Sequence, residues 1–428
     1  MTMTNKQKQD VSQQPSGSTR RTILQAGVVA TGALALPKSL AARASDFGPG
    51  NPTKVTVVLF QRGGADHLNI YAPTGDSNYA NLRPTVGIGA PGSAAAVEGL
   101  AMDQIFSMHP AMAGTHAAFT ASNSTCGIVH AVGYVPASLS HFQSQANYET
   151  TFSGISSGGW INRHLQATST PQDAPVRALA LRGSLPQSMW GPYPCYAVAR
   201  TDELVYAGAA DARDYLAKLA GATEMAGMLR EHQAAYQSQR DTFALLDLFG
   251  GLDPDNYVPA NGAVYPEGSL GSSLRQIAEV IKAGLGVEFL TVDQGGWDTH
   301  SEIVARIEGN VTALDQATTA FYTDLGLLAD DVVLVTMSEF GRTAPENGSA
   351  GTDHGMGGAM LLRGGPVNGG MVHGNWPTLA PSALISGCYL DPVNDFRDVL
   401  REVLDVHMGG TDPAVVFPGW VHQPIGAL

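Results

Sequence analysis

The chain has 428 residues, of which 44% are hydrophobic and only 14% are charged, and its formal net charge is −14. This acidity argues against nucleic acid or an anionic membrane surface as a partner. Because the chain contains 50 Gly and 25 Pro residues, we expect compact elements joined by turn-rich loops.

The N-terminal segment is typical of an export signal. Arg20-Arg21 precedes an apolar run from Ala26 to Leu36, and Ala42-Arg43-Ala44 follows as a small-residue cleavage site. The arginine pair indicates the twin-arginine export machinery, and an ordinary secretion signal with a fortuitous pair is the alternative. We therefore expect a signal peptide over 1–44 and a periplasmic or secreted single domain over 45–428. That domain is expected to contain no integral membrane span.

Four apolar runs predict buried strands of a parallel sheet, and they cover 54–60, 126–132, 287–292 and 332–337. Apolar residues at helical spacing, together with local composition, predict helices over 211–249, 272–285, 311–330 and 396–407. Strands that alternate with helices are typical of an open α/β sheet.

Each predicted strand ends in a loop that carries Asp, Glu, His or Ser. In strand order, the residues are Asp66, Ser140-His141, Asp298 with His300, and Ser338-Glu339. Ligands bind beyond the carboxyl ends of strands in such sheets, so we expect these loops to meet at one edge. The segment Thr352-Asp353-His354 adds a second Asp/His pair in a Gly-rich loop.

Structural interpretations of the same residues remain open. Asp66 is alternatively the cap of a turn, and Glu339 alternatively pairs with Arg342 or Arg62. Ser140 is either a nucleophile at a helix N-terminus or a simple N-cap whose capping box is completed by a glutamine.

Other classes of site have little support in the sequence. Cys126, Cys195 and Cys388 show no CxxC spacing, so one disulfide is possible but a cysteine metal or redox site is not expected. The chain contains no G-x-S-x-G elbow and no dinucleotide or Walker pattern, which disfavours an ordinary α/β-hydrolase and a nucleotide-binding fold.

Taken together, these segments resemble the domain-of-unknown-function family numbered 1501, whose members are commonly exported by the twin-arginine route. The matching motifs span almost the whole mature chain in order. They are Arg62-Gly63-Gly64-Ala65-Asp66-His67-Leu68-Asn69, Leu82-Arg83-Pro84, His109-Pro110-Ala111-Met112, Ser140-His141-Phe142, Trp297-Asp298-Thr299-His300, Met337-Ser338-Glu339-Phe340-Gly341-Arg342-Thr343 and Thr352-Asp353-His354-Gly355.

That family is grouped with the alkaline phosphatase and sulfatase superfamily. The resemblance implies an alkaline-phosphatase-like α/β sandwich, with a mostly parallel central sheet and helices on both faces. It also implies a metal-assisted hydrolytic site at the strand ends, with Ser140 as nucleophile. The implied metal ligands are Asp66, Asp298, His300, Glu339 and His354. The chain departs from the pattern where an Asp-His pair is expected, because Glu339-Phe340 stands there.

The leading hypothesis is an exported hydrolase of small phosphate or sulfate esters that uses a divalent metal (Zn, Mn, Mg or Ca). Ser140 would attack, and His141, Arg62 or Arg342 would orient or stabilise the ester oxygens. The alternative is a non-catalytic secreted binding or assembly protein that retains the fold, and Phe340 in place of a histidine favours it. An oxidoreductase has no cofactor fingerprint to support it.

Overall fold

The computed structural model describes residues 54–152, 158–169, 176–203 and 245–428. Contacts divide the chain into two units, Met1–Leu36 and Pro37–Leu428, and every described residue belongs to the second. The export signal expected over 1–44 and most of the helical region expected over 211–249 lie outside the described residues.

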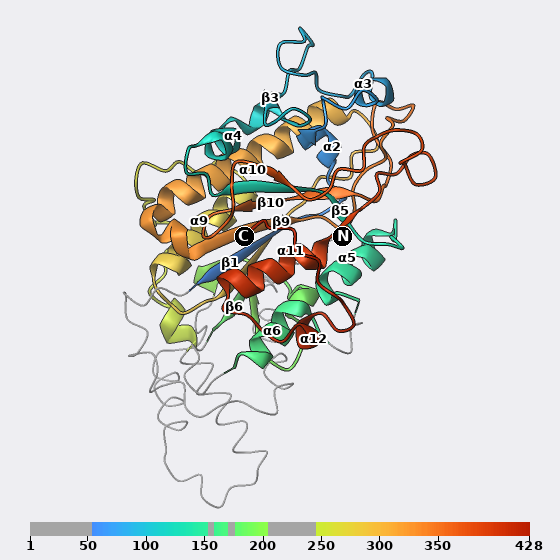
Figure 1. The fold of residues 1–428 in the computed structure, drawn as a ribbon. Coiled ribbons are helices and arrows are strands. Elements are labelled where there is room, and N and C mark those ends of the chain that lie inside the picture. Colours follow the sequence, from blue (N-terminus) through green and yellow to red (C-terminus); the bar gives the residue numbers. More distant parts are fainter. Residues whose placement is uncertain (1–53, 153–157, 170–175, 204–244) are drawn as a thin grey trace, which may run out of the picture. The chain divides into compact units, whose positions relative to one another are not determined.

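A nine-stranded sheet lies at the centre of this domain (Figure 1). Its strands are β1 (Val55–Gln61), β5 (Cys126–Gly133), β6 (Ala178–Leu181), β7 (Tyr196–Val198), β8 (Phe289–Gln294), β9 (Val332–Met337), β10 (Gly358–Arg363), β11 (Val372–His373) and β12 (Asn394–Asp395). Neighbours follow the order β11-β5-β10-β9-β1-β8-β6-β7, and β12 pairs with β5. The four strands predicted from sequence correspond to β1, β5, β8 and β9.

The sheet is mixed because one strand runs against the others. β1 is parallel to β8 and β9, and β6 is parallel to β8 and β7. β10 is antiparallel to both β9 and β5, so β5 points in the same direction as β9. The carboxyl ends of β1, β5, β8 and β9 therefore share one edge of the sheet.

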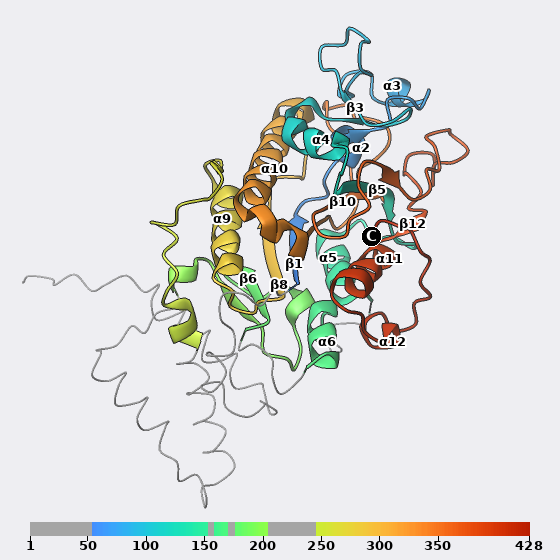
Figure 2. The same ribbon diagram turned by 60° about the vertical axis from the view of Figure 1, so that its left-hand side comes forward.

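Helices cover both faces of the sheet (Figures 1 and 2). One face carries α4 (Ala113–Thr120), α9 (Ser269–Lys282) and α10 (Ile303–Leu325), and the other carries α5 (His141–Thr150), α6 (Trp160–Ala167) and α11 (Phe396–Glu402). The smaller elements are α2 (His67–Ile70), α3 (Tyr79–Leu82), α12 (Pro413–Val416) and a three-stranded sheet of β2 (Tyr71–Ala72), β4 (Ser107–Met108) and β3 (Leu100–Ala101). In the described residues, no helix is long and apolar enough to span a bilayer.

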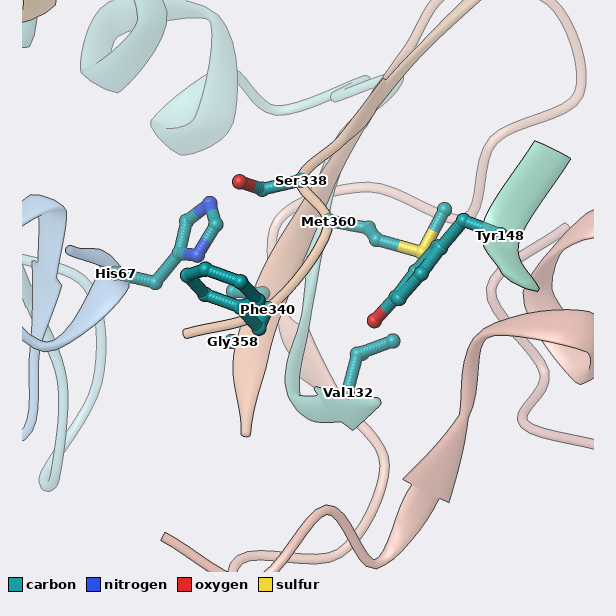
Figure 3. Close-up of a pocket in the computed structure, with 8 residues that line it drawn as sticks. His67, Val132, Tyr148, Ser338, Phe340, Gly358 and Met360 are labelled. Carbon is teal, nitrogen blue, oxygen red and sulfur yellow. The ribbon is translucent and has the colours of Figure 1, made fainter. Parts of the chain in front are cut away.

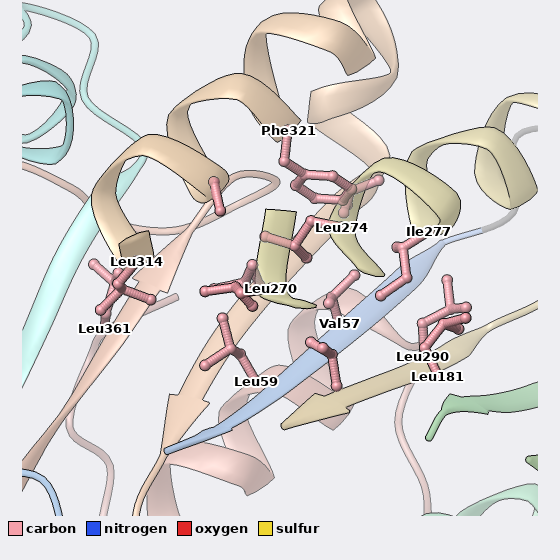
Figure 4. Close-up of a cluster of buried hydrophobic side chains, with 14 of the residues drawn as sticks. Val57, Leu59, Leu181, Leu270, Leu274, Ile277, Leu290, Leu314, Phe321 and Leu361 are labelled. Atoms are coloured by element: carbon pink, nitrogen blue, oxygen red, sulfur yellow. The ribbon is translucent and has the colours of Figure 1, made fainter. Parts of the chain in front are cut away.

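The sheet has a cluster of buried apolar side chains on each face. These two clusters explain why the sequences of the central strands are continuous apolar runs. Val57 and Leu59 of β1 pack toward Leu274 of α9 and Phe321 of α10 (Figure 4). The alternate residues, Val58 among them, join the core beneath α6 and α11. A strand buried on both faces has no polar side, which is the pattern expected inside a helix-covered sheet.

Some helix boundaries differ from the prediction. The helix expected over 311–330 begins earlier, at Ile303, and ends at Leu325, before the 3₁₀ turn Gly326–Asp331. Gly326 has a positive φ of 56°, which glycine adopts without the steric cost of a side chain. The helix expected over 396–407 is α-helical to Glu402 and continues as a π-helical turn over Val403–His407. Cys126, Cys195 and Cys388 are all free.

A buried carboxylate, Asp324, joins the loop before α9 to the end of α10. It accepts hydrogen bonds from the hydroxyls of Tyr257 (2.8 Å) and Tyr265 (3.0 Å) and from the amide of Ala260 (2.6 Å), and it pairs with Lys282. Burial alone raises the pKa of Asp324, but these donors outweigh it and hold the pKa below its usual value.

Replacing Asp324 with Asn is expected to lower the free energy of unfolding by about 2–4 kcal/mol at neutral pH, because a partly buried cation and two hydroxyls lose their anionic acceptor. A carboxyl whose pKa is depressed by folding stabilises above its unfolded-state pKa, and the benefit is lost as pH falls through the folded-state value. In urea unfolding curves, the difference between the two proteins should therefore shrink below about pH 4. A difference that stays constant with pH would contradict this origin.

Candidate metal centre

Four polar side chains from three separate connections converge at the shared edge of the sheet. His141 begins α5 after the loop from β5, Asp298 and His300 lie between β8 and α10, and His354 lies between β9 and β10. In the part of the chain that the structure describes, His141, Asp298 and His354 are the one group whose ligand atoms all lie within 4.8 Å of one another. They could hold a metal ion, and His300 adjoins two of them.

Asp298 is the common neighbour of the imidazoles. Its Oδ2 lies 3.5 Å from Nε2 of His141, and its Oδ1 lies 3.1 Å from Nε2 of His300 and 3.3 Å from Nε2 of His354. The Nε2 atoms of His300 and His354 are 3.1 Å apart. All three rings therefore present the same nitrogen to one carboxylate.

The other ring nitrogen of each histidine has its own acceptor. Nδ1 of His141 lies 2.9 Å from Oε1 of Glu339, and Nδ1 of His300 lies 2.9 Å from Oδ1 of Asp353. Nδ1 of His354 lies 2.8 Å from the carbonyl oxygen of Leu139. Because these oxygens can only accept, a neutral ring satisfies them with its proton on Nδ1, and that tautomer has its lone pair on Nε2.

This arrangement fits a cation. Two Nε2 lone pairs that face each other at 3.1 Å repel unless a proton or a metal ion lies between them. Ligands at 2.0–2.1 Å from a tetrahedral ion lie about 3.3 Å from one another, close to the separations between Asp298 and the three Nε2 atoms. Orientation of each ligating imidazole by an acceptor on its other nitrogen is also the usual arrangement around bound metals.

The pKa values favour the form that ligates metal. Burial lowers the pKa of His354, which favours its neutral ring. The hydrogen bond from His300 lowers the pKa of Asp353. Burial raises the pKa of Asp298, but the hydrogen bond and positive charge of Arg342 outweigh this effect and lower it overall. These shifts favour ionised Asp298 and Asp353 and an uncharged His354 ring.

Arg342 hydrogen-bonds to the loops that carry the residues of the centre. Its guanidinium donates to the carbonyls of Gly63, Gly64 (2.7 Å), Trp297 (3.1 Å) and Thr352 (3.0 Å) and to Oδ1 of Asp298 (2.6 Å). Its side chain is completely buried. Arg342 was expected to stabilise ester oxygens, but the structure instead gives each of its nitrogens an acceptor within the protein.

Arg62 also differs from the anion-binding role expected for it. Its Nη2 lies 2.5 Å from Oε1 of Glu149 and 3.1 Å from Oδ1 of Asp293, and its guanidinium stacks 3.7 Å above the ring of Phe60. These carboxylates neutralise its charge. The structure therefore places Arg62 in an ion-pair network beside the centre rather than among its ligands.

Asp66 was the ligand expected after the first strand, and the structure gives it a different partner. Nη1 of Arg83 lies 2.8 and 2.9 Å from its two oxygens, and Thr352 Oγ1 donates to Oδ2 at 2.9 Å. The Asp66 side chain is completely buried and makes no capping hydrogen bond to α2. Asp66 is thus neither in the ligand group nor the turn cap considered as its alternative.

Glu339, another expected ligand, lies behind His141. Its Oε1 accepts hydrogen bonds from the amide of Gly63 (2.9 Å), from His141 and from Nε2 of Gln145 (3.0 Å). Neither arginine considered as its alternative partner bonds to it. Gly63 can approach this closely because it lacks a side chain: its φ is 122°, and a Cβ would lie 2.6 Å from the Asp298 amide nitrogen.

Phe340 occupies the position where the resemblance seen in the sequence implies a histidine. Its ring centroid lies 4.9 Å from that of His141 and 4.6 Å from that of His354, so it forms an apolar wall of the centre. Phe340 also lines a small cavity, together with His67, Ser338 and Met360 (Figure 3). Sequence could not show that Phe340 supports two imidazoles.

In the sequence, Ser140 stands between Leu139 and His141, which both contact residues of the centre. The carbonyl oxygen of Leu139 accepts a hydrogen bond from His354, and His141 lies beside Asp298. Ser140 occupies the N-cap position of α5, but its side chain makes no capping hydrogen bond, and Gln143 bonds to Asn147 instead of completing a capping box. Since Ser140 is exposed, the structure favours an available hydroxyl over the capping interpretation.

Replacing Glu339 with Gln is expected to lower zinc affinity by about 10–100-fold, because the carboxylate that orients His141 is lost. Calorimetric zinc titration measures the effect. Replacing Glu346, which binds the amides of Thr85 and Val86 away from the centre, with Gln is a matched control that should leave affinity unchanged. Equal losses in both variants would contradict the positioning role of Glu339.

The chain belongs to a family described as Protein of unknown function (DUF1501), whose model matches residues 53–417. Comparison with curated proteins and with solved structures found no match.

Proposed function

We propose that the protein is an exported hydrolase of phosphate or sulfate esters that uses a divalent metal ion held by His141, His300, His354 and Asp298. The observation that carries the proposal is the pair of Nε2 atoms 3.1 Å apart, with both Nδ1 atoms already engaged. Among Zn, Mn, Mg and Ca, three imidazoles favour Zn. An alkaline-phosphatase-like fold, a signal over 1–44 and a periplasmic or secreted location belong to the same proposal.

The chemistry divides between the ion and the chain. A bound ion would supply Lewis acidity that makes a nearby hydroxyl a better nucleophile and stabilises charge on ester oxygens. Ser140 Oγ would bond to phosphorus or sulfur and lose its proton to solvent, while the bond to the leaving oxygen breaks and that oxygen takes up a proton. A water molecule would then displace Ser140 from the covalent ester and return a proton to its hydroxyl.

The binding or assembly alternative retains one supporting observation. Asp66, in the connection between β1 and α2, forms a buried ion pair with Arg83 and is not a ligand in the centre. A structural role for the strand-end residues predicts metal binding without turnover, or no metal at all.

The test is elemental analysis of the purified protein, followed by assays of the zinc-loaded protein with 4-nitrophenyl phosphate and 4-nitrophenyl sulfate. We expect stoichiometric zinc, and turnover that Ser140→Ala reduces by about three orders of magnitude or more. The control is Ser349→Ala, at an exposed serine in the connection from β9 to β10. Absence of bound zinc, or turnover that is unchanged in Ser140→Ala, would overturn the corresponding part of the proposal.

A further inference from the structure

The formal charges around the candidate centre cancel once a divalent ion is added. The carboxylates of Asp298, Glu339 and Asp353 each contact one or more of the imidazoles. Among the described residues, Arg342 is the only arginine or lysine that hydrogen-bonds to any of the three, through Asp298. Three negative charges, one positive charge and a divalent ion leave no net positive charge for the substrate.

The neighbouring cationic side chains are already paired. Arg62 is neutralised by Glu149 and Asp293, and Arg83 by Asp66. The lysines in the described part of the chain, Lys54 and Lys282, lie just before β1 and at the end of α9, and they form ion pairs with Asp331 and Asp324 respectively. None of these groups is left to receive a second negative charge on a substrate.

We infer that the centre selects esters with a single negative charge, namely sulfate monoesters and phosphate diesters, over dianionic phosphate monoesters. The inference rests on the proposed function, because it names the substrate class of the same centre. A monoanion meets a neutral site, whereas the second charge of a dianion loses its hydration near three carboxylates and gains no cationic partner.

Binding of inert analogues tests this selectivity separately from turnover. Methyl(phenyl)phosphinate is a monoanion, phenylphosphonate is a dianion at alkaline pH, and neither contains an ester bond to hydrolyse. Calorimetry on the zinc-loaded full-length protein is expected to show that the phosphinate binds more tightly than the phosphonate. Equal affinities, tighter binding of the phosphonate, or binding of neither analogue would overturn the inference.

A matched pair of lysine variants on α5 tests the electrostatic cause. Gln145 bonds to Glu339, whereas Gln143 is exposed and bonds to Asn147. Gln145→Lys should raise the ratio of phosphonate to phosphinate affinity about fivefold, since it adds a charge beside the centre. Gln143→Lys should leave the ratio unchanged, as should Arg306→Ala, which removes an exposed cation from α10. Equal ratios in the two lysine variants, or a changed ratio in Arg306→Ala, would overturn the inference.

Turnover separates the two proposals. Faster hydrolysis of bis(4-nitrophenyl) phosphate and 4-nitrophenyl sulfate than of 4-nitrophenyl phosphate would support both. Hydrolysis with the dianionic monoester preferred would retain the hydrolase and overturn the charge selectivity. Preferential phosphinate binding without turnover of any ester would support the charge selectivity and contradict the hydrolase.

Discussion

Replacing Asp298 with Asn is expected to lower zinc affinity by at least about 100-fold, the largest effect on metal binding that we expect from a single substitution. Asp298 is the only residue that approaches all three imidazoles within the described chain. An amide removes its charge but keeps its shape and an oxygen acceptor for Arg342, so the variant is expected to fold. Competition with a chelator of known zinc affinity measures the change.

Asp293 supplies a matched control on the same strand end. Its two oxygens bind Arg62 (3.1 Å) and Arg182 (2.7 Å) rather than the imidazoles. Asp293→Asn should therefore keep the zinc affinity of the unaltered protein. Retained affinity in Asp298→Asn, or an equal loss in Asp293→Asn, would show that Asp298 is not a ligand.

Replacing Asp66 with Ala is expected to lower the free energy of unfolding by about 3–5 kcal/mol, because the cationic Arg83 is left buried without its counter-charge. Arg83 is only 2% exposed, and it also donates to the carbonyls of Thr343 (2.7 Å) and Ala344 (2.9 Å). Chemical denaturation measures the loss. Lys54→Ala breaks the exposed pair with Asp331 and should cost no more than about 1 kcal/mol.

The same variant distinguishes the structural role of Asp66 from the ligand role that the family resemblance implied. Under conditions where Asp66→Ala remains folded, its zinc affinity should lie within a few-fold of that of the unaltered protein. A loss as large as that expected for Asp298→Asn, without a comparable loss of stability, would restore Asp66 to the ligand set.

The fold was predictable where burial alone determines the residue pattern. β1, β5, β8 and β9 are buried on both faces, and their apolar runs identified them. β6 was missed because Ala178–Leu181 is short, and β10 was missed because Gly358–Arg363 begins with glycine and ends with arginine. Direction was not predictable from composition either, since the antiparallel course of β10 depends on which strands it pairs with.

The location of the candidate site was predictable, but the contacts of its residues were less so. The rule that ligands lie beyond the carboxyl ends of strands selected the edge where Asp298, His300 and His354 meet. His141 was expected to orient the ester, but its Nε2 faces Asp298. In the sequence, only its position next to Ser140 indicated that it would lie near the centre. The sequence could not reveal that Arg83 forms an ion pair with Asp66, because that pairing depends on how the loop after β1 folds.

The antiparallel direction of β10 affects how readily members of this family could evolve to recognise different molecules. A parallel neighbour would require a crossover to the far end of the sheet, whereas β9 and β10 are joined by a connection that starts and finishes at one edge. Glu339 and His354 both lie on it, and residues 348–350 between them are exposed. Exposed loop tips tolerate insertions, so evolution could lengthen the segment 348–350 to recognise new molecules while Glu339 and His354 keep their positions.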